Sequence, residues 1–173
     1  MKSLSEQMVA YGAYHRHPHN KLTHFVGVPL VTFSIFLFLS WFRFVPAPEI
    51  PLTGATLFYL CVAVYYLRLD WKVALLQAPF TLAMLWLADR IALWPLHQTL
   101  LIFAGTFAGG WIIQLIGHGI EGRRPALADN FLQLFNAPLF LTTEATLLNP
   151  KFTGLEYNSM ARMDLRNVKR VGK

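Results

Sequence analysis

Long apolar runs dominate this sequence, and they indicate whether the chain folds in water or in a lipid bilayer. The first run extends from Phe25 to Val45, and Arg43 is the only charged residue in it. At about 1.5 Å per residue, a helix of this length spans the hydrocarbon core of a bilayer, which is about 30 Å thick. Charged residues make up 14% of the chain, whereas about 25% is usual for a soluble domain. The sequence therefore predicts an integral membrane protein.

Three further apolar runs follow the first one. They extend over Leu52–Leu67, Val73–Ala88 and Leu96–Gly117, and the polar segment RLDWK separates the first two of them. The last run contains the glycines of GTFAGGW, which allow neighbouring backbones to approach closely. We therefore expect this run to form the central helix. The predicted fold class is all-α, an integral membrane helical bundle with four transmembrane helices.

A fifth segment, Phe131–Leu148, is ambiguous because Gln133, Asn136, Pro138 and Glu144 lie among its apolar residues. A full crossing by this segment would place the basic C-terminal tail outside the cell, against the positive-inside rule. We therefore expect a re-entrant or interfacial fifth helix, with both termini in the cytoplasm.

The chain reads as a single membrane domain over residues 1–173, because no repeat or Pro/Gly/Ser-rich linker divides it. It comprises a cytoplasmic histidine-rich N-terminal segment (1–24), the helical bundle (25–148) and a basic cytoplasmic tail (149–173). The formal charge is +6, but the basic residues lie between apolar runs and in the tail, so no nucleic-acid partner is expected. Cys61 is the only cysteine, which excludes an internal disulfide.

Four of the six histidines lie close together in the segment YHRHPHNKLTH: His15, His17, His19 and His24. Pro18 disfavours helix at the residue before it, so the segment predicts a helix end, a turn and a new helix that Asn20 caps. A turn of this kind can direct imidazoles from two helices at one point.

A second polar group, QLIGHGIEGRRPALADN, lies at the end of the fourth apolar run. Gln114, His118 and Glu121 recur at intervals of four and three residues, so they share one helical face. The predicted topology places this face on the same side of the membrane as the N-terminal histidines. Imidazole with carboxylate suits Fe(II), Zn or Mn, and two histidines with one carboxylate suit iron that activates O₂. We predict a metal site from six candidates, the last two weaker: His15, His24, His118, Glu121, His19 and Glu144.

Other polar residues near these segments have more than one interpretation. Arg123 and Arg124 either mark the cytoplasmic side or bind a substrate carboxylate through a bidentate contact. Glu144 lies in an apolar run, where a carboxylate usually faces a partner or a wet cavity. It could be a metal ligand, a partner of an imidazole, or an ion-pair partner of the arginines. His97, at the opposite end of its run, is expected to be an interfacial residue.

The segments YGAYHRHPHNKLTHFVGVP and QLIGHGIEGRRPALADN, separated by three hydrophobic runs, resemble the Fe(II)-dependent 2-hydroxy fatty acid dioxygenase family. This family comprises a fungal enzyme of fatty acid α-oxidation and bacterial membrane-protein relatives. The resemblance extends from about Tyr11 to Glu144. It implies a non-haem Fe(II) enzyme that uses O₂ to remove one carbon from a 2-hydroxy fatty acid.

The resemblance also implies roles for individual residues. The family's recurring histidines match His15, His24 and His118, whereas its pattern does not require His17 or His19. Four further positions match predicted catalytic residues, namely Tyr14, Asn20, Gln114 and Glu121. The implied partners are a fatty acid, O₂ and the bilayer, and an oligomer is compatible with the sequence. The implied location is a bacterial inner membrane in preference to the endoplasmic reticulum.

Two other classes of function fit the same residues. A zinc or di-metal membrane lipid hydrolase could use Glu121 or Glu144 as a general base, and metal analysis would separate it from an oxygenase because zinc has no redox chemistry. A small membrane transporter or structural protein could place Glu144 and His118 along an ion path. Such a path needs polar residues at successive depths, whereas the polar residues here gather at one interface. We therefore favour the oxygenase.

Overall fold

The described part of the chain is helical, with one short pair of strands. The computed structural model describes residues 4–12, 14–15, 17–45, 52–122, 125 and 133–147. In chain order the elements are α1 (Leu4–Gly12), α2 (Pro18–Ser40), β1 (Arg43–Val45), β2 (Leu52–Thr53), α3 (Gly54–Leu69), α4 (Trp71–Ile91), α5 (Leu96–Glu121) and α6 (Gln133–Leu147). The all-α prediction is confirmed for these residues, apart from the antiparallel β1–β2 pair, which the sequence pattern did not indicate.

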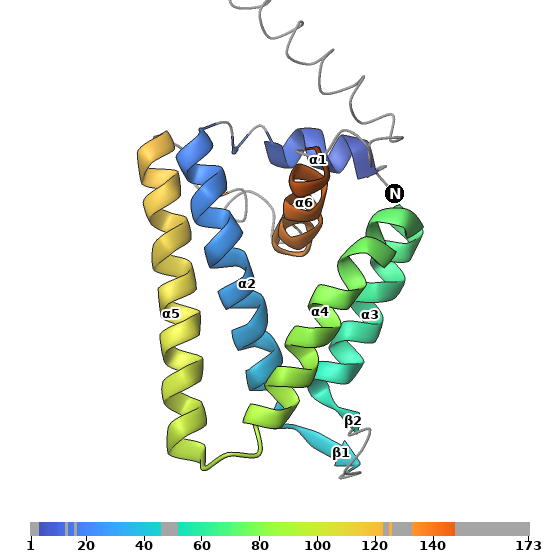
Figure 1. Cartoon of the computed structure of the whole chain (residues 1–173), viewed down its shortest axis with the longest axis vertical. Coiled ribbons are helices and arrows are strands. Elements are labelled where there is room, and N and C mark those ends of the chain that lie inside the picture. Colours follow the sequence, from blue (N-terminus) through green and yellow to red (C-terminus); the bar gives the residue numbers. More distant parts are fainter. Residues whose placement is uncertain are drawn as a thin grey trace, which may run out of the picture.

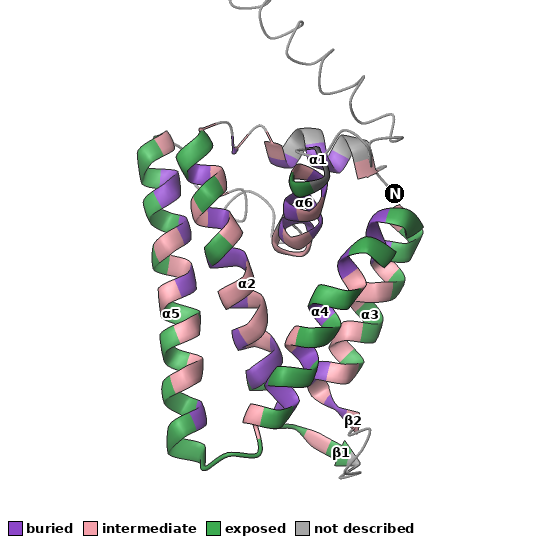
Figure 2. Cartoon of the chain, viewed as in Figure 1, coloured by how far each residue is buried: buried purple, intermediate pink, exposed green. Residues whose placement is uncertain are grey.

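Three of the described helices, α2, α4 and α5, are long and apolar enough to cross a membrane. Helix α3 is apolar but has only 16 residues, fewer than the roughly 20 that a span usually needs. Large apolar side chains such as Phe80, Trp86 and Leu101 are exposed, and exposed positions occur along the length of α4 and α5 (Figure 2). Such a surface is compatible with lipid contact.

Helix α2 begins earlier than the apolar run that predicted it. Pro18 occupies the first turn, where its missing N–H group costs nothing, and His17 is the N-cap. The His17 Nδ1 atom accepts a hydrogen bond from the His19 backbone N–H at 3.2 Å. The predicted helix end, turn and new helix are therefore confirmed, but the prediction that Asn20 caps this helix is wrong.

The first apolar run also does not stay helical as far as Val45. Helix α2 ends at Ser40, and residues Arg43–Val45 form β1. The Arg43 guanidinium donates a hydrogen bond to the Asp89 carbonyl oxygen at 2.7 Å. The run of apolar residues could not show this bend, because the partner of Arg43 lies on a different helix.

Helix α2 is the central helix of the described bundle. It packs along α5 on one side and against the α3–α4 pair on the other, while α1 and α6 lie together at one end (Figure 1). Helix α5 packs mainly on α2 and leaves most of its surface exposed (Figure 2). The prediction that the Leu96–Gly117 run forms the central helix is therefore wrong.

Glycines set the close approach of α2 and α5. A Cβ atom at Gly27 would lie 2.8 Å from the Gly110 carbonyl oxygen, and one at Gly117 would overlap the Thr23 hydroxyl and lie 2.5 Å from Asn20 Oδ1. Gly110 therefore allows the close backbone approach that the GTFAGGW motif predicted, whereas Gly105 and Gly109 face open space. This close contact brings the polar end of α5 directly against the first turns of α2.

Helix α6 is tied to the bundle at both of its ends. The Tyr66 hydroxyl on α3 donates a hydrogen bond to the Phe135 carbonyl oxygen at 2.7 Å. Near the other end, Lys21 on α2 forms an ion pair with Glu144 at 2.8 Å. Between these contacts Phe140 is buried in a core that includes Tyr11 of α1. Helix α6 therefore covers the space between α2 and the α3–α4 pair (Figure 1).

Candidate metal centre

Three histidines from distant parts of the sequence meet at one end of the bundle. His15 lies in the turn after α1, His24 lies on α2, and His118 lies on the last turns of α5. Each offers one nitrogen to a group in which all ligand atoms lie within 4.8 Å of one another. All three side chains are buried, with exposed fractions of 1%, 1% and 5%. Among the described residues, this is the one group of histidine, cysteine and carboxylate side chains that could hold a metal ion.

The turn between α1 and α2 fixes the position of His15. Its backbone N–H donates a hydrogen bond to the Gly12 carbonyl oxygen, which continues the end of α1 as a tight turn. The imidazole stacks on the Tyr11 ring at a centroid distance of 4.2 Å and meets the His24 ring edge-on at 4.4 Å. The ring is therefore held by contacts on two sides before any ligand binds.

Backbone carbonyls determine which ring nitrogen carries the proton in two of the histidines. His15 Nδ1 lies 2.8 Å from the Tyr11 carbonyl oxygen, and His24 Nδ1 lies 2.9 Å from the Asn20 carbonyl oxygen. A carbonyl oxygen can only accept, so both Nδ1 atoms donate and both Nε2 atoms of the neutral rings carry lone pairs. The pKa of His15 is lowered to about 3, first by burial and then by the neighbouring His24, so its neutral form is favoured.

The two Nε2 atoms of His15 and His24 lie only 3.1 Å apart. Two lone pairs at this distance repel each other unless an electrophile lies between them. Two imidazole nitrogens that bind one metal ion at about 2.1 Å and at a right angle lie about 3.0 Å apart. His118 Nδ1 is also buried and has no hydrogen-bond partner. The three histidines therefore fit a divalent transition metal ion.

Asn20 connects this cluster to the predicted carboxylate. Its side-chain nitrogen donates hydrogen bonds to Glu121 Oε2 and to the Tyr14 carbonyl oxygen, while its own backbone carbonyl accepts from His24 Nδ1. The Glu121 carboxylate is thus not part of the three-histidine group but is bound to the residue that orients His24. Carboxylates placed in this way commonly fix the orientation of a metal-binding histidine.

The two weaker predicted ligands, His19 and Glu144, do not belong to the three-histidine group. His19 is exposed, and Glu144 pairs with Lys21. His97 is exposed near the opposite end of α5. Residues 123 and 124, the two predicted substrate-binding arginines, lie outside the described residues.

Two residues that position the site were not identified from the sequence. Tyr11 supplies both the stacked ring and the carbonyl oxygen for His15, and its spacing of four residues from His15 could have indicated this contact. Lys21 pairs with Glu144 across 123 positions of sequence, so no local pattern could have revealed the contact.

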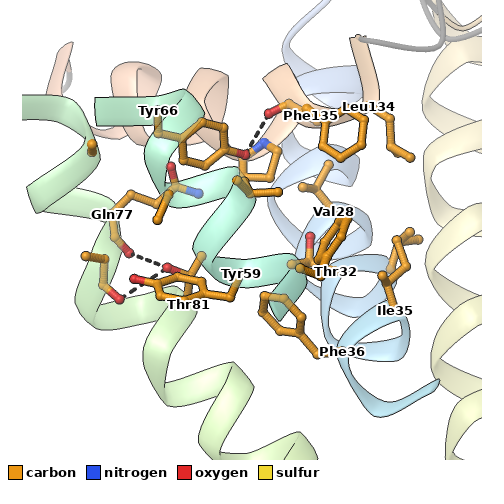
Figure 3. Close-up of a pocket in the computed structure, with 18 of the residues that line it drawn as sticks. Val28, Thr32, Ile35, Phe36, Tyr59, Tyr66, Gln77, Thr81, Leu134 and Phe135 are labelled. Atoms are coloured by element: carbon orange, nitrogen blue, oxygen red, sulfur yellow. Dashed lines mark hydrogen bonds between the residues drawn. The ribbon is translucent and has the colours of Figure 1, made fainter. Parts of the chain in front are cut away.

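Two neighbouring cavities lie near the histidine cluster. The smaller has a volume of about 30 Å³ and is lined by the three histidines together with Trp111, Gln114 and Leu134. The larger, about 180 Å³, lies between α2, α3, α4 and α6 and has a mainly apolar lining (Figure 3). Gln114, Leu134 and Ala137 line both. The larger cavity therefore adjoins the one that the histidines line.

The fold and the site together define a helical protein with helices of membrane-spanning length and a buried three-histidine centre suited to a metal ion. The sequence model of the family described as 2-hydroxy-palmitic acid dioxygenase Mpo1-like matches residues 1–148, and the chain belongs to this family. The family resemblance of the two polar segments is thereby confirmed.

A curated relative supports the same assignment. The chain is 34% identical over 143 residues to the 2-hydroxy-palmitic acid dioxygenase MPO1 of Saccharomyces cerevisiae. The match covers 82% of this chain and 78% of the yeast protein. No solved structure matches the chain.

Proposed function

We propose that this protein is an Fe(II)-dependent dioxygenase that uses O₂ to shorten 2-hydroxy fatty acids by one carbon. The observation that carries the proposal is the buried group of three histidines, whose small cavity shares lining residues with a mainly apolar one. The family and the yeast relative add the substrate class, since the relative is named as acting on 2-hydroxy-palmitic acid. Fe(II) at the histidines would supply the redox chemistry that O₂ requires and that the side chains lack.

The residues of the chain provide binding and orientation for this reaction. The apolar cavity between α2, α3, α4 and α6 accommodates the acyl chain, so the carboxylate and the 2-hydroxyl lie at the small cavity beside His15, His24 and His118. The backbone carbonyls of Tyr11 and Asn20 hold two of the imidazoles with Nε2 directed at the centre. Burial lowers the pKa of His15 and so favours its neutral form, and the burial of the three side chains excludes water from the reacting atoms.

Product analysis tests this function. The protein, purified in detergent without oxygen and loaded with ferrous ion, should consume O₂ when 2-hydroxypalmitate is added and should yield an acid one carbon shorter. Palmitate, which lacks the 2-hydroxyl group, is the matched control and should support neither. O₂ uptake without the shortened product would refute the proposal.

A zinc lipid hydrolase is the second candidate, and one observation favours it. The described ligand group contains three imidazoles and no carboxylate, and three histidines bind zinc in some hydrolytic sites. Stoichiometric zinc in the purified protein, with release of fatty acid from an ester and no O₂ uptake, would establish this function in place of the first.

Arg123 and Arg124 form part of the proposal as the residues that hold the substrate carboxylate. They directly follow the α5 segment that contains His118 and Glu121. The planar guanidinium group donates two parallel hydrogen bonds to a carboxylate, which lysine cannot do. We expect Arg123→Lys and Arg124→Lys to raise the Michaelis constant for 2-hydroxypalmitate with normal iron content. Unchanged constants in both variants would refute this role.

The proposed membrane arrangement has four spans, α2 to α5, with α6 as a re-entrant or interfacial helix. Both termini then face the cytoplasm, and the location is a bacterial inner membrane. Single cysteines at Ser3, Ala126 and Ser159, in a Cys61→Ala background, should all be protected from an impermeant thiol reagent in intact cells. Labelling of the Ser159 cysteine alone would show that the fifth segment crosses the membrane.

A further inference from the structure

The apolar cavity contains a polar atom that the proposed function does not use. Gln77 on α4 lines the cavity between α2, α3, α4 and α6, and its side chain is only 4% exposed (Figure 3). Its Oε1 atom is buried and has no hydrogen-bond partner. An unpaired buried acceptor costs about 1–3 kcal/mol, so a binding partner for this atom is expected.

The neighbouring tyrosine fixes the orientation of the Gln77 amide. The Tyr66 hydroxyl donates its proton to the Phe135 carbonyl oxygen at 2.7 Å, so it can only accept a hydrogen bond from Gln77. The amide nitrogen of Gln77 must therefore face Tyr66. The oxygen is left as an acceptor that requires a donor.

Thr81, one turn further along α4, gives the contrast within the same cavity. Its hydroxyl lies 3.3 Å from the Gln77 carbonyl oxygen and 3.2 Å from the Ala78 carbonyl oxygen, so its proton is used inside the helix (Figure 3). Thr81 therefore needs no ligand, although it lies beside a residue that does.

The remaining lining restricts what the donor can be. Val28, Ile35, Phe36 and Phe58 make the cavity wall mainly apolar, and burial of a charged group such as an ammonium would be strongly unfavourable there. A neutral hydroxyl on an apolar chain meets both requirements.

We propose that this cavity binds an acyl chain that carries a hydroxyl group, and that Gln77 Oε1 accepts a hydrogen bond from that hydroxyl. The inference rests on the proposed function for the identity of the acyl ligand. The hydroxyl lies further along the chain than C2, because the proposed function places the 2-hydroxyl at the small cavity beside the histidines, which Gln77 does not line. Gln77 is then a specificity-determining residue, because a chain without the hydroxyl leaves its oxygen unpaired.

Equilibrium binding tests the proposal without requiring turnover. Detergent-purified protein is titrated with palmitate and with 2-, 10- and 16-hydroxypalmitate in competition with radiolabelled palmitate. The 10- or the 16-hydroxylated acid should bind about tenfold more tightly than palmitate, and the position of its hydroxyl identifies the one that is recognised. No preference for either of these two acids would overturn the proposal.

Variants of Gln77 test whether its Oε1 atom causes the preference for a hydroxylated acid. Gln77→Leu keeps the volume of the side chain and removes the acceptor, so the preference should disappear; Gln77→Met serves if the leucine variant does not fold. Thr81→Val should keep the full preference, because the hydroxyl of Thr81 is bonded within α4. A preference that persists in the Gln77 variants would refute the role of this residue. Normal binding preference without O₂ uptake would refute the proposed reaction alone.

Discussion

Two polar clusters near opposite ends of α2 differ in whether their polar groups have hydrogen-bond partners. The histidine cluster comprises His15, His24 and His118, and the Asp89 cluster comprises Arg43, Thr53 and Asp89. In the Asp89 cluster, the Thr53 hydroxyl donates to Asp89 Oδ1 at 3.1 Å and Arg43 donates to the Asp89 carbonyl oxygen at 2.7 Å. In the histidine cluster, two lone pairs face each other at 3.1 Å and a third ring has an unpartnered nitrogen.

The difference separates a structural cluster from a candidate binding site. The hydrogen bonds of the Asp89 cluster join the ends of α2, α3 and α4 and need no further ligand. The histidine cluster directs unshared nitrogens at one another and is stabilised only when something binds between them. Burial alone does not distinguish the two, since both contain buried side chains.

The largest expected effect is the loss of a histidine from the histidine cluster. His15→Ala, His24→Ala and His118→Ala should each reduce activity by more than about 100-fold and lower bound metal, since water replaces an imidazole ligand poorly. Metal analysis and O₂ uptake measure the two effects. His97→Ala is the matched control, because His97 is exposed near the other end of α5, and it should change neither.

A smaller effect is expected for the residues that orient His24. Asn20→Asp replaces the donor that faces Glu121 with a second carboxylate, and should reduce activity about 10 to 100-fold with partial loss of metal. Glu121→Gln keeps an acceptor oxygen for Asn20 and should retain bound metal. If Glu121→Gln loses metal as completely as His118→Ala, then Glu121 is itself a ligand and the described arrangement changes when metal binds.

Variants of the Asp89 cluster should affect stability and leave the metal in place. Asp89→Ala removes the acceptor of the buried Thr53 hydroxyl and should cost about 1–3 kcal/mol, observed as a lower midpoint of thermal unfolding. Asp89→Asn keeps an oxygen at this position and should cost less. Loss of metal in a folded Asp89→Ala variant would remove the distinction between the two clusters.

The smallest effect is expected for the ion pair between Lys21 and Glu144. Their side chains are 32% and 19% exposed, and exposed pairs usually contribute less than about 1 kcal/mol. A double-mutant cycle with Lys21→Met and Glu144→Gln should therefore give a small coupling energy in thermal unfolding. A coupling energy of several kcal/mol would show that this pair controls the position of α6 over the cavity.

The sequence predicted the helical class and the family because both are recorded in local patterns. Apolar runs indicated most of the helices, and the spacing of polar residues identified the two histidine-containing segments as candidate site segments. It also anticipated that His15, His24 and His118 would meet, since the predicted topology placed their segments on the same side. The boundaries of α2 were missed because His17 and Arg43 act through specific hydrogen bonds.

The finer arrangement of the site depends on contacts between distant residues. Local spacing placed Glu121 beside His118, but it could not show that Asn20, from α2, donates a hydrogen bond to the Glu121 carboxylate. Likewise, no pattern in the sequence indicated that Gln77 would be buried with an unpaired oxygen. Such features follow from the packing of α2 against α5 and of α4 against α6.

The central claim is that the three histidines hold a redox-active metal ion, and metal quantitation tests it most directly. Wild-type protein and the His118→Ala variant are purified without oxygen, supplied with ferrous ion and then passed through a desalting column. We predict about one iron per chain in the wild type, with O₂ uptake on addition of 2-hydroxypalmitate, and loss of both in the variant. Normal iron and full activity in His118→Ala would contradict the account.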